Sequence, residues 1–176
     1  KSNFLITSLT KIIEKKIFLS CNISTVVSKI DSKRIERLYN TKPQILENGI
    51  NLSTLVCSKK NIKLPKKFIF FNGSYLYKPN FLAINTLIEN IMPKIIKKNP
   101  KVKLVICGGG FNKSIKKKFL INLGILKKKE LVKVIKKAKC LAVPLTHGFG
   151  TRIKIIEALM LGCKVITSYK GIQGID

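Results

Sequence analysis

A repeated order of short apolar runs, glycine-bearing loops and helical patterns constrains the fold of this chain most strongly. The apolar runs are typical of buried strands, and the longer segments between them have the apolar spacing of helices. Strands that alternate with helices form parallel sheets, so the order predicts an α/β fold, a Rossmann-like, doubly wound parallel sheet with helices on both faces. The expected strands are 68–71, 102–107, 120–124, 140–145 and 164–167, and the expected helices are 80–98, with Pro93 as a kink or a break, 129–139 and 151–161.

A weaker pattern of the same kind precedes this repeat. Its expected elements are a helix over 4–16, a strand over 23–27, a helix capped at Asp31-Ser32 and a strand over 43–46. The basic segment after Gly110 is also expected to be helical.

Composition shifts divide the chain into three parts. Residues 52–67 are polar, rich in lysine and contain Pro65, so they are expected to be a linker. Residues 1–51 are then the tail of an N-terminal Rossmann-like domain, and 68–176 an incomplete C-terminal one. The chain does not begin with Met and ends where a further helix is expected, which favours a fragment.

The charge balance is strongly basic, with 35 Lys and Arg against 8 Asp and Glu and a net charge of +27. Such a charge is typical of proteins that bind nucleic acid or an anionic membrane surface. Only Arg34, Arg37 and Arg152 are arginines, however, and arginine is the usual residue for bidentate recognition of phosphates and bases. Because lysines occur along the whole chain, we favour a compositional bias, with weak attraction to a membrane surface as its by-product.

Other protein classes are excluded by composition. The hydrophobic fraction of 45% is that of a globular protein, and no apolar run approaches the roughly 18–20 residues of a membrane-spanning helix. The five cysteines are far apart and have no metal-ligand spacing, so we expect reduced core residues of a cytoplasmic protein. No metal is expected.

Two glycine loops resemble phosphate-binding motifs without matching them. In 108–114, Asn112 stands where a P-loop needs a glycine before its lysine. In 148–153, Ile153 replaces the third glycine of the dinucleotide fingerprint. Neither nucleotide-binding class is supported.

The loop around Gly148 and Gly150 still has the physics of a diphosphate site. It is expected to open a helix whose first turn contains Thr151, Arg152 and Lys154, so that free backbone N–H groups, the helix dipole and two cations converge. Glu157 follows Lys154 by three residues on the same helix face. Its carboxylate could accept hydrogen bonds from ribose hydroxyls or form a surface ion pair with Lys154, and spacing alone leaves both open.

The segment 143–167 resembles the nucleotide-sugar signature of the group-one glycosyltransferases, retaining enzymes of family four with the GT-B fold. Shorter stretches at 47–51, 71–74, 104–108 and 123–126 agree in the same order. The resemblance implies transfer of a sugar from a nucleotide diphosphate sugar to an acceptor hydroxyl with retention of configuration. The acceptor would be a glycan or a lipid-linked group, and the enzyme would work in the cytoplasm or at the inner face of a membrane.

The resemblance also implies roles for individual residues. Glu157 matches the ribose-binding glutamate, Lys154 with the amides near Gly150 the diphosphate site, and Gly124 with Ile125 the loop against the base. Phe149 stands where many members have a glutamate that contacts the sugar, so the donor sugar is open, and the neighbouring His147 either contacts it or is solvated. The residues expected to bind substrate are Gly73, Gly124, Ile125, His147, Gly148, Gly150, Thr151, Arg152, Lys154 and Glu157, with Lys154 and Glu157 also assigned to catalysis.

Three alternatives remain. A nucleotide-sugar epimerase or an inactive nucleotide-sugar-binding relative would share the fold, and a basic nucleic-acid-binding protein would explain the charge. If the transferase reading is right, residues 1–176 alone are expected to be inactive, because the reaction cleft of such enzymes lies between two domains.

Overall fold

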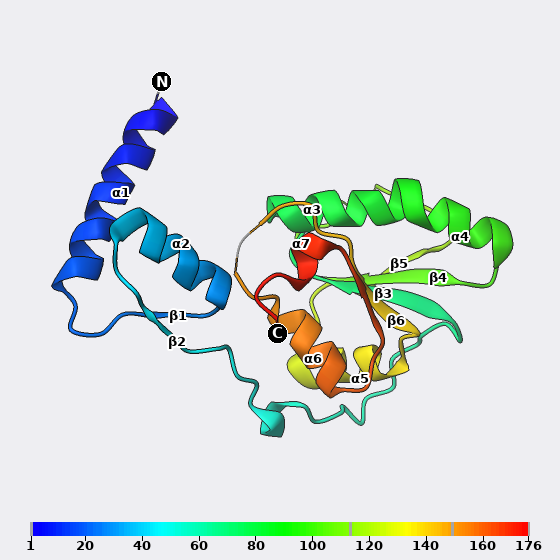
Figure 1. The fold of residues 1–176 in the computed structure, drawn as a ribbon. Helices are drawn as coiled ribbons and strands as arrows, with labels where there is room; N and C mark the ends of the chain where they lie inside the picture. The colour runs from blue at the N-terminus through cyan, green and yellow to red at the C-terminus, as the bar shows by residue number, and fades with distance from the viewer. Residues whose placement is uncertain (1, 113, 149, 176) are drawn as a thin grey trace.

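A five-stranded parallel sheet forms the centre of the larger part of the molecule, which follows the segment 46–67 (Figure 1). The structure, a computed structural model, describes residues 2–112, 114–148 and 150–175. The strand order is β5-β4-β3-β6-β7, with all neighbouring pairs parallel. The strands are β3 (Phe68–Asn72), β4 (Lys103–Cys107), β5 (Leu120–Asn122), β6 (Cys140–Val143) and β7 (Val165–Thr167).

Helices cover both faces of this sheet, as Figure 1 shows. One face carries a continuous helical run of α3 (Lys78–Asn85), the π-helical turn η2 (Thr86–Ile91) and α4 (Met92–Lys98). The other face carries α5 (Lys128–Lys137) and α6 (Ile153–Met160). The predicted doubly wound α/β fold is therefore confirmed.

The helical run 78–98 continues through Pro93, with a wider π-helical turn just before it. Pro93 has no N–H to donate to the carbonyl four residues earlier. The π-helical turn Thr86–Ile91 lies just before it, where the hydrogen-bond ladder can adjust without breaking the helix.

The core is built mainly from the central strands. Phe68, Phe70 and Phe71 of β3 are buried, and the same holds for β4 and β6 on either side. Full burial of a large apolar side chain contributes about 1.5–3 kcal/mol. This core fixes the strand ends from which the loops of the site emerge.

The first part of the chain forms a smaller unit with α1 (Ser2–Ser20), β1 (Thr25–Val26), α2 (Lys29–Tyr39) and β2 (Gln44–Ile45). β1 and β2 pair in parallel. The N-cap of α2 is Ser28 rather than Asp31 or Ser32, because the Ser28 hydroxyl accepts a hydrogen bond from the Asp31 amide. The aromatic rings of Phe18 and Tyr39 stack at 5.6 Å and join α1 to α2.

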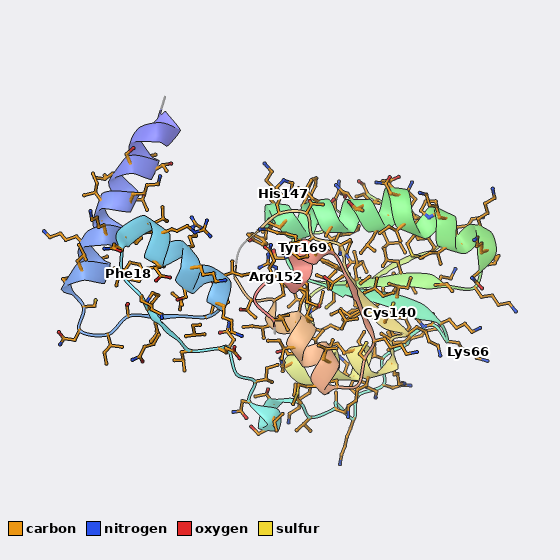
Figure 2. All side chains as sticks on the ribbon, viewed as in Figure 1. Phe18, Lys66, Cys140, His147, Arg152 and Tyr169 are labelled. Carbon is orange, nitrogen blue, oxygen red and sulfur yellow. The ribbon has the colours of Figure 1, made fainter. Side chains whose placement is uncertain are left out.

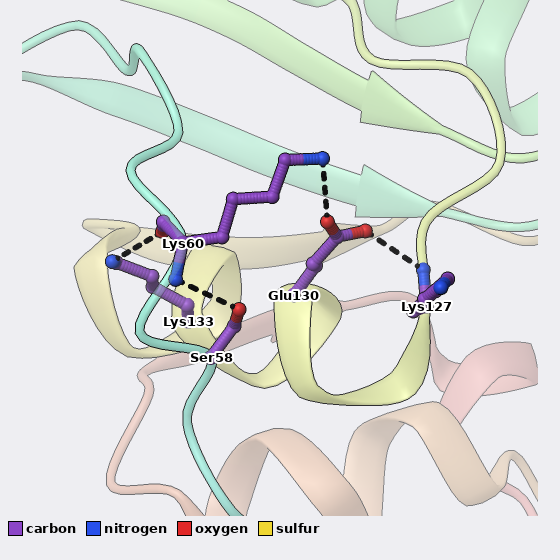
Figure 3. A network of polar contacts seen from close by, with 5 residues as sticks. All are labelled: Ser58, Lys60, Lys127, Glu130 and Lys133. Carbon is purple, nitrogen blue, oxygen red and sulfur yellow. Dashed lines mark hydrogen bonds and ion pairs between the residues drawn. The ribbon is translucent and has the colours of Figure 1, made fainter.

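The segment 46–67 contains one short 3-10 turn, η1 (Leu52–Thr54), and is bonded to α5 (Figure 3). Lys60 forms an ion pair with Glu130 at 3.0 Å and accepts a hydrogen bond from Lys133 at 2.6 Å. The Lys127 amide donates to the same Glu130 carboxylate. The pKa of Glu130 is lowered, chiefly by the hydrogen bond from Lys60. The residues expected to form a linker therefore lie along α5, a helix that covers the five-stranded sheet.

Two expectations from the sequence are wrong. No helix forms in the described residues of 111–119; Phe111 instead packs edge-on against Tyr75 at 5.1 Å. Cys21 and Cys57 are exposed, whereas Cys107, Cys140 and Cys163 are in the core as expected.

The structure adds a short helix that the sequence pattern did not indicate, α7 (Tyr169–Ile172). Within the described residues, no helix combines the length and apolar character needed to span a bilayer.

A close approach of two loops holds the carboxyl ends of β3 and β4 together. Gly73 donates to the Cys107 carbonyl at 2.9 Å, and Gly108 has a φ of +142°. A Cβ atom at Gly108 would overlap the Gly73 carbonyl. Only glycine fits there.

We expect Gly108→Ala to destabilise the protein by about 1–3 kcal/mol from backbone strain alone, and by more because of the overlap with Gly73. Thermal unfolding measures the loss. Gly49→Ala is the matched control, since nothing lies within 4 Å of a Cβ there. Equal melting temperatures for the two variants would contradict the close approach.

Candidate functional site

The site lies where the sheet reverses its strand order. The chain leaves β3 toward β4 and leaves β6 toward β7, so the loops after β3 and β6 diverge at the carboxyl edge. Ligands of doubly wound sheets bind in the crevice at such a point. The predicted glycine loops after β3, β4 and β6 all emerge at this edge.

Lys154 of α6 reaches this crevice and is largely buried. Its Nζ donates to the Asn72 carbonyl at 2.6 Å and to Asn80 Oδ1 at 3.1 Å, and it lies 4.5 Å from the centroid of the Phe71 ring. Burial, with a smaller contribution from the charge of Arg152, lowers the pKa of Lys154 to about 8. A cation is thus held in place at the switch point, with neutral acceptors as its partners.

Asn80 is the buried residue that organises the β3 loop. Its amide donates to the Ser74 carbonyl at 3.1 Å while its oxygen accepts from Lys154. A Cβ at Gly73 would lie 2.6 Å from Asn80 Nδ2, so Gly73 allows this packing as well as close approach by a ligand. The side-chain oxygen of Asn72 is buried without a hydrogen-bond partner within the part of the chain that the structure describes.

The loop between β6 and α6 folds back on itself. Arg152 donates to the Gly150 carbonyl, and Thr151 Oγ1 donates to the Gly174 carbonyl at 3.2 Å. The helix begins at Ile153, so the expectation that Thr151 and Arg152 belong to its first turn is wrong. Both residues precede the helix, and their side chains bond the carbonyls of Gly150 and Gly174.

The sequence-predicted sugar contacts are only partly described. His147 is exposed, with Nδ1 2.8 Å from Thr146 Oγ1, and it lies on the same side of the sheet as Arg152 (Figure 2). Gly148 lies beside the Arg152 guanidinium. Phe149 lies outside the described residues.

Glu157 pairs with a lysine from the neighbouring helix. Its carboxylate accepts from Lys128 of α5, with side-chain exposures of 13% and 39%. Lys154 points to β3 instead, so the alternative of a surface ion pair between Lys154 and Glu157 is wrong. Lys128 follows Ile125 by three residues and was missed by sequence reasoning, because no spacing within one helix connects α5 with α6.

The loop before α5 lies against the β4 glycines. Gly124 accepts a hydrogen bond from the Gly108 amide at 2.8 Å, and Asn122 Oδ1 accepts from the Gly124 amide at 2.9 Å. Ile125 is 82% exposed next to Gly109. Gly124 and Ile125 therefore border the same edge as Lys154 and the Lys128–Glu157 pair.

This arrangement suits an anion with attached hydroxyl and apolar groups. The groups that it offers are the largely buried ammonium of Lys154, the Glu157 carboxylate that already pairs with Lys128, the backbone of the glycine loops and the exposed side chain of Ile125. Across the described residues, no group of three His, Cys, Asp or Glu side chains could hold a metal ion.

Comparisons with known proteins identify the family of the chain. Residues 66–175 match the family model described as Glycosyl transferases group 1. The chain belongs to this family. No curated protein sequence matches it significantly.

Solved structures match the fold at low identity. Sucrose-phosphate synthase from Thermosynechococcus elongatus is 19% identical with a TM-score of 0.69, over 94% of this chain and 45% of that one. TarM is 14% identical with a TM-score of 0.65, over 89% and 31%. Anabaena HepE, crystallised with UDP and glucose, is 13% identical with a TM-score of 0.61, over 85% and 45%. The chain spans less than half of these structures, and the expected GT-B fold is confirmed.

Lys154 should make stability rise with pH in a defined window. Its pKa falls on folding from 10.5 to about 8, so between these values the unfolded chain binds a proton that the folded chain has released. Stability through this group therefore increases as the pH rises from about 8 toward the ordinary lysine range.

Urea unfolding of the wild type and of Lys154→Met across this range isolates the effect of Lys154, because the other lysines are common to both proteins. The wild type should gain more stability than the variant. An identical gain would mean that Lys154 is not a buried cation.

Proposed function

We propose that the chain is the nucleotide-sugar-binding part of a glycosyltransferase, which moves a sugar from a nucleotide diphosphate sugar to an acceptor hydroxyl with retention of configuration. The observation that carries the proposal is the largely buried Lys154 ammonium at the switch point of the sheet, whose hydrogen bonds within the described residues go to two neutral oxygens. An anionic diphosphate is the partner that this charge lacks.

Lys154 would act on the leaving group. Negative charge on the departing diphosphate grows in the transition state, and a fixed cation there stabilises the transition state more than the bound donor. The amides near Gly150 and Thr151 would share this charge, and Gly73 would let the diphosphate approach. No protein nucleophile is required, so the site would work by positioning and electrostatics.

Glu157 would bind the ribose while keeping Lys128. A carboxylate has about four acceptor positions on two oxygens, so one can hold Lys128 while others accept from vicinal hydroxyls. The pairing with Lys128 would orient the carboxylate before the donor arrives. The exposed side chain of Ile125, with the backbone of Gly124, would border the base.

UDP-sugars are the first donors to test, because the HepE structures contain UDP, UDP-glucose or UDP with glucose in the same fold. The acceptor would be a glycan or a lipid-linked group, and the reaction would take place in the cytoplasm or at the inner face of a membrane. His147 would contribute to sugar choice. Calorimetric titration of the chain with UDP, ADP and GDP tests the donor site, and binding of none of them would overturn the proposal.

Glu157→Ala should weaken nucleotide diphosphate binding by roughly 10- to 150-fold, because a hydrogen bond to a charged group contributes about 1.5–3 kcal/mol. Isothermal titration measures the change. Glu130→Ala is a matched control, since that carboxylate also pairs with a lysine but lies between α5 and the 46–67 segment. If both variants bind like the wild type, Glu157 does not bind the ribose.

Donor binding and transfer should need no divalent metal. Hard cations prefer several carboxylate ligands, and the charge of the diphosphate would be met here by Lys154. Binding of UDP should persist in excess EDTA and weaken strongly in Lys154→Ala. Loss in EDTA with recovery on adding Mn²⁺ would contradict the metal-free assignment and move the site away from α6.

A further inference from the structure

A group of lysines lies at one edge of the five-stranded sheet. Because the strands are parallel, their amino ends lie together, opposite the edge that holds Lys154. Every strand of the sheet is preceded, or begun, by lysine. These residues, here called the lysine edge, are Lys66 and Lys67 at β3, Lys101 and Lys103 at β4, Lys116, Lys117 and Lys118 at β5, Lys139 at β6 and Lys164 at β7.

Figure 2 shows the separation of the two edges. Lys66 lies at one end of the sheet, and His147 and Arg152 lie at the other. All members of the lysine edge except Lys103 are exposed. The group is therefore presented to solvent on the side away from the candidate donor site.

The opposite edge has fewer lysines. The described residues of the loops 73–77, 108–112, 123–126, 144–152 and 168–175 contain two cationic side chains, those of Arg152 and Lys170. Further lysines stand where helices begin at this edge, and they are Lys78 at α3, Lys127, Lys128 and Lys129 at α5, and Lys154 at α6. Of these, Lys128 is paired with Glu157 and Lys154 is bonded to the β3 loop, whereas most of the lysine edge has no acid beside it among the described residues.

Local effects account for part of the pattern only. Lys97, Lys98, Lys136 and Lys137 end α4 and α5 at this side, where cations favour the helix dipole. No such helix end directly precedes Lys66 or the Lys116–Lys118 run in the described chain. Acids do not neutralise the edge either, because one ion pair, Lys117 with Glu89 at 3.6 Å, is found there among the described residues.

We propose that the lysine edge is a contact surface for an anionic lipid bilayer. The exposed lysines stand at the ends of five neighbouring strands, which suits an extended anionic surface better than a single small ligand. A shallow hollow at this edge is lined by apolar Ile96, Pro100 and Phe119 and by Lys97, Lys103 and Lys118, which suits lipid headgroups above an apolar layer.

Nucleic acid fits this surface less well. The lysine edge contains no arginine, the residue that best matches phosphates and bases by bidentate bonding. Exposed aromatic side chains, on which bases stack, are Tyr77, Phe81 and Tyr169 in the described chain, and these lie near the carboxyl edge. The lysine edge can therefore attract phosphate groups, but it lacks the side chains that would recognise or stack on bases.

Vesicle sedimentation tests the proposal. The full chain should bind vesicles of phosphatidylcholine and phosphatidylglycerol in equal parts, and should not bind phosphatidylcholine alone. Each lysine near an anionic surface contributes roughly fivefold in affinity. The triple variant Lys101→Glu, Lys116→Glu, Lys118→Glu should therefore bind at least about 100-fold more weakly.

The matched comparison uses a rival surface with the same change in charge. Helix α1 exposes Ile6, Leu9, Ile13 and Ile17 together with lysines, so it could also meet a bilayer. Lys11→Glu, Lys15→Glu, Lys16→Glu should weaken binding by less than about tenfold. A loss equal to or greater than that of the edge variant overturns the proposal.

Two further measurements keep the outcome clear. The corresponding Lys→Gln triple at the edge, checked by thermal unfolding, should retain the fold and still lose most of the binding. Single-stranded RNA is added as competitor at the same salt concentration. If RNA binds the lysine edge more tightly than the vesicles do, the surface is a nucleic-acid site and the membrane assignment fails.

Discussion

The candidate site depends on the bonds that hold the Lys154 ammonium between α6, β3 and α3. Removing a charge from water is costly unless other groups replace the water. The Asn72 carbonyl and Asn80 Oδ1 do so at 2.6 and 3.1 Å, but neither carries a negative charge. Among the described residues the two hydrogen-bond acceptors of the cation are neutral, which is the arrangement that the proposed anion site requires.

The glycines are consequences of the same constraint. Asn80 can reach Lys154 only if Gly73 has no side chain, and the β3 loop can meet β4 only if Gly108 has none. The Gly108 amide in turn bonds Gly124, which places the loop of Ile125 and the start of α5. From there Lys128 meets Glu157 on α6. Backbone and side-chain contacts thus connect the loops around the crevice.

The sequence predicted the alternating elements because each has its own period and its own capping or turn residues. It failed for 111–119, where the basic pattern resembled a helix but Phe111 packs against Tyr75. It also missed the partners of the site. Asn80 and Lys154 are 74 residues apart and Lys128 and Glu157 are 29 apart, and only the strand order brings them together. The lysine edge could not be predicted for the same reason. Its residues are far apart in the sequence, and parallel pairing brings the amino ends of the strands together.

The two ends of the sheet are electrostatically separate. A five-residue strand such as β4 rises about 3.3 Å per residue and so spans roughly 17 Å, about twice the screening length of about 8 Å at physiological salt. Charges at the lysine edge therefore contribute little through solvent to an anion at Lys154. Binding of an anion at the proposed donor site would then depend on Lys154 and the groups around it. An edge bound to a bilayer would leave that site facing away from the surface, open to donor from solution.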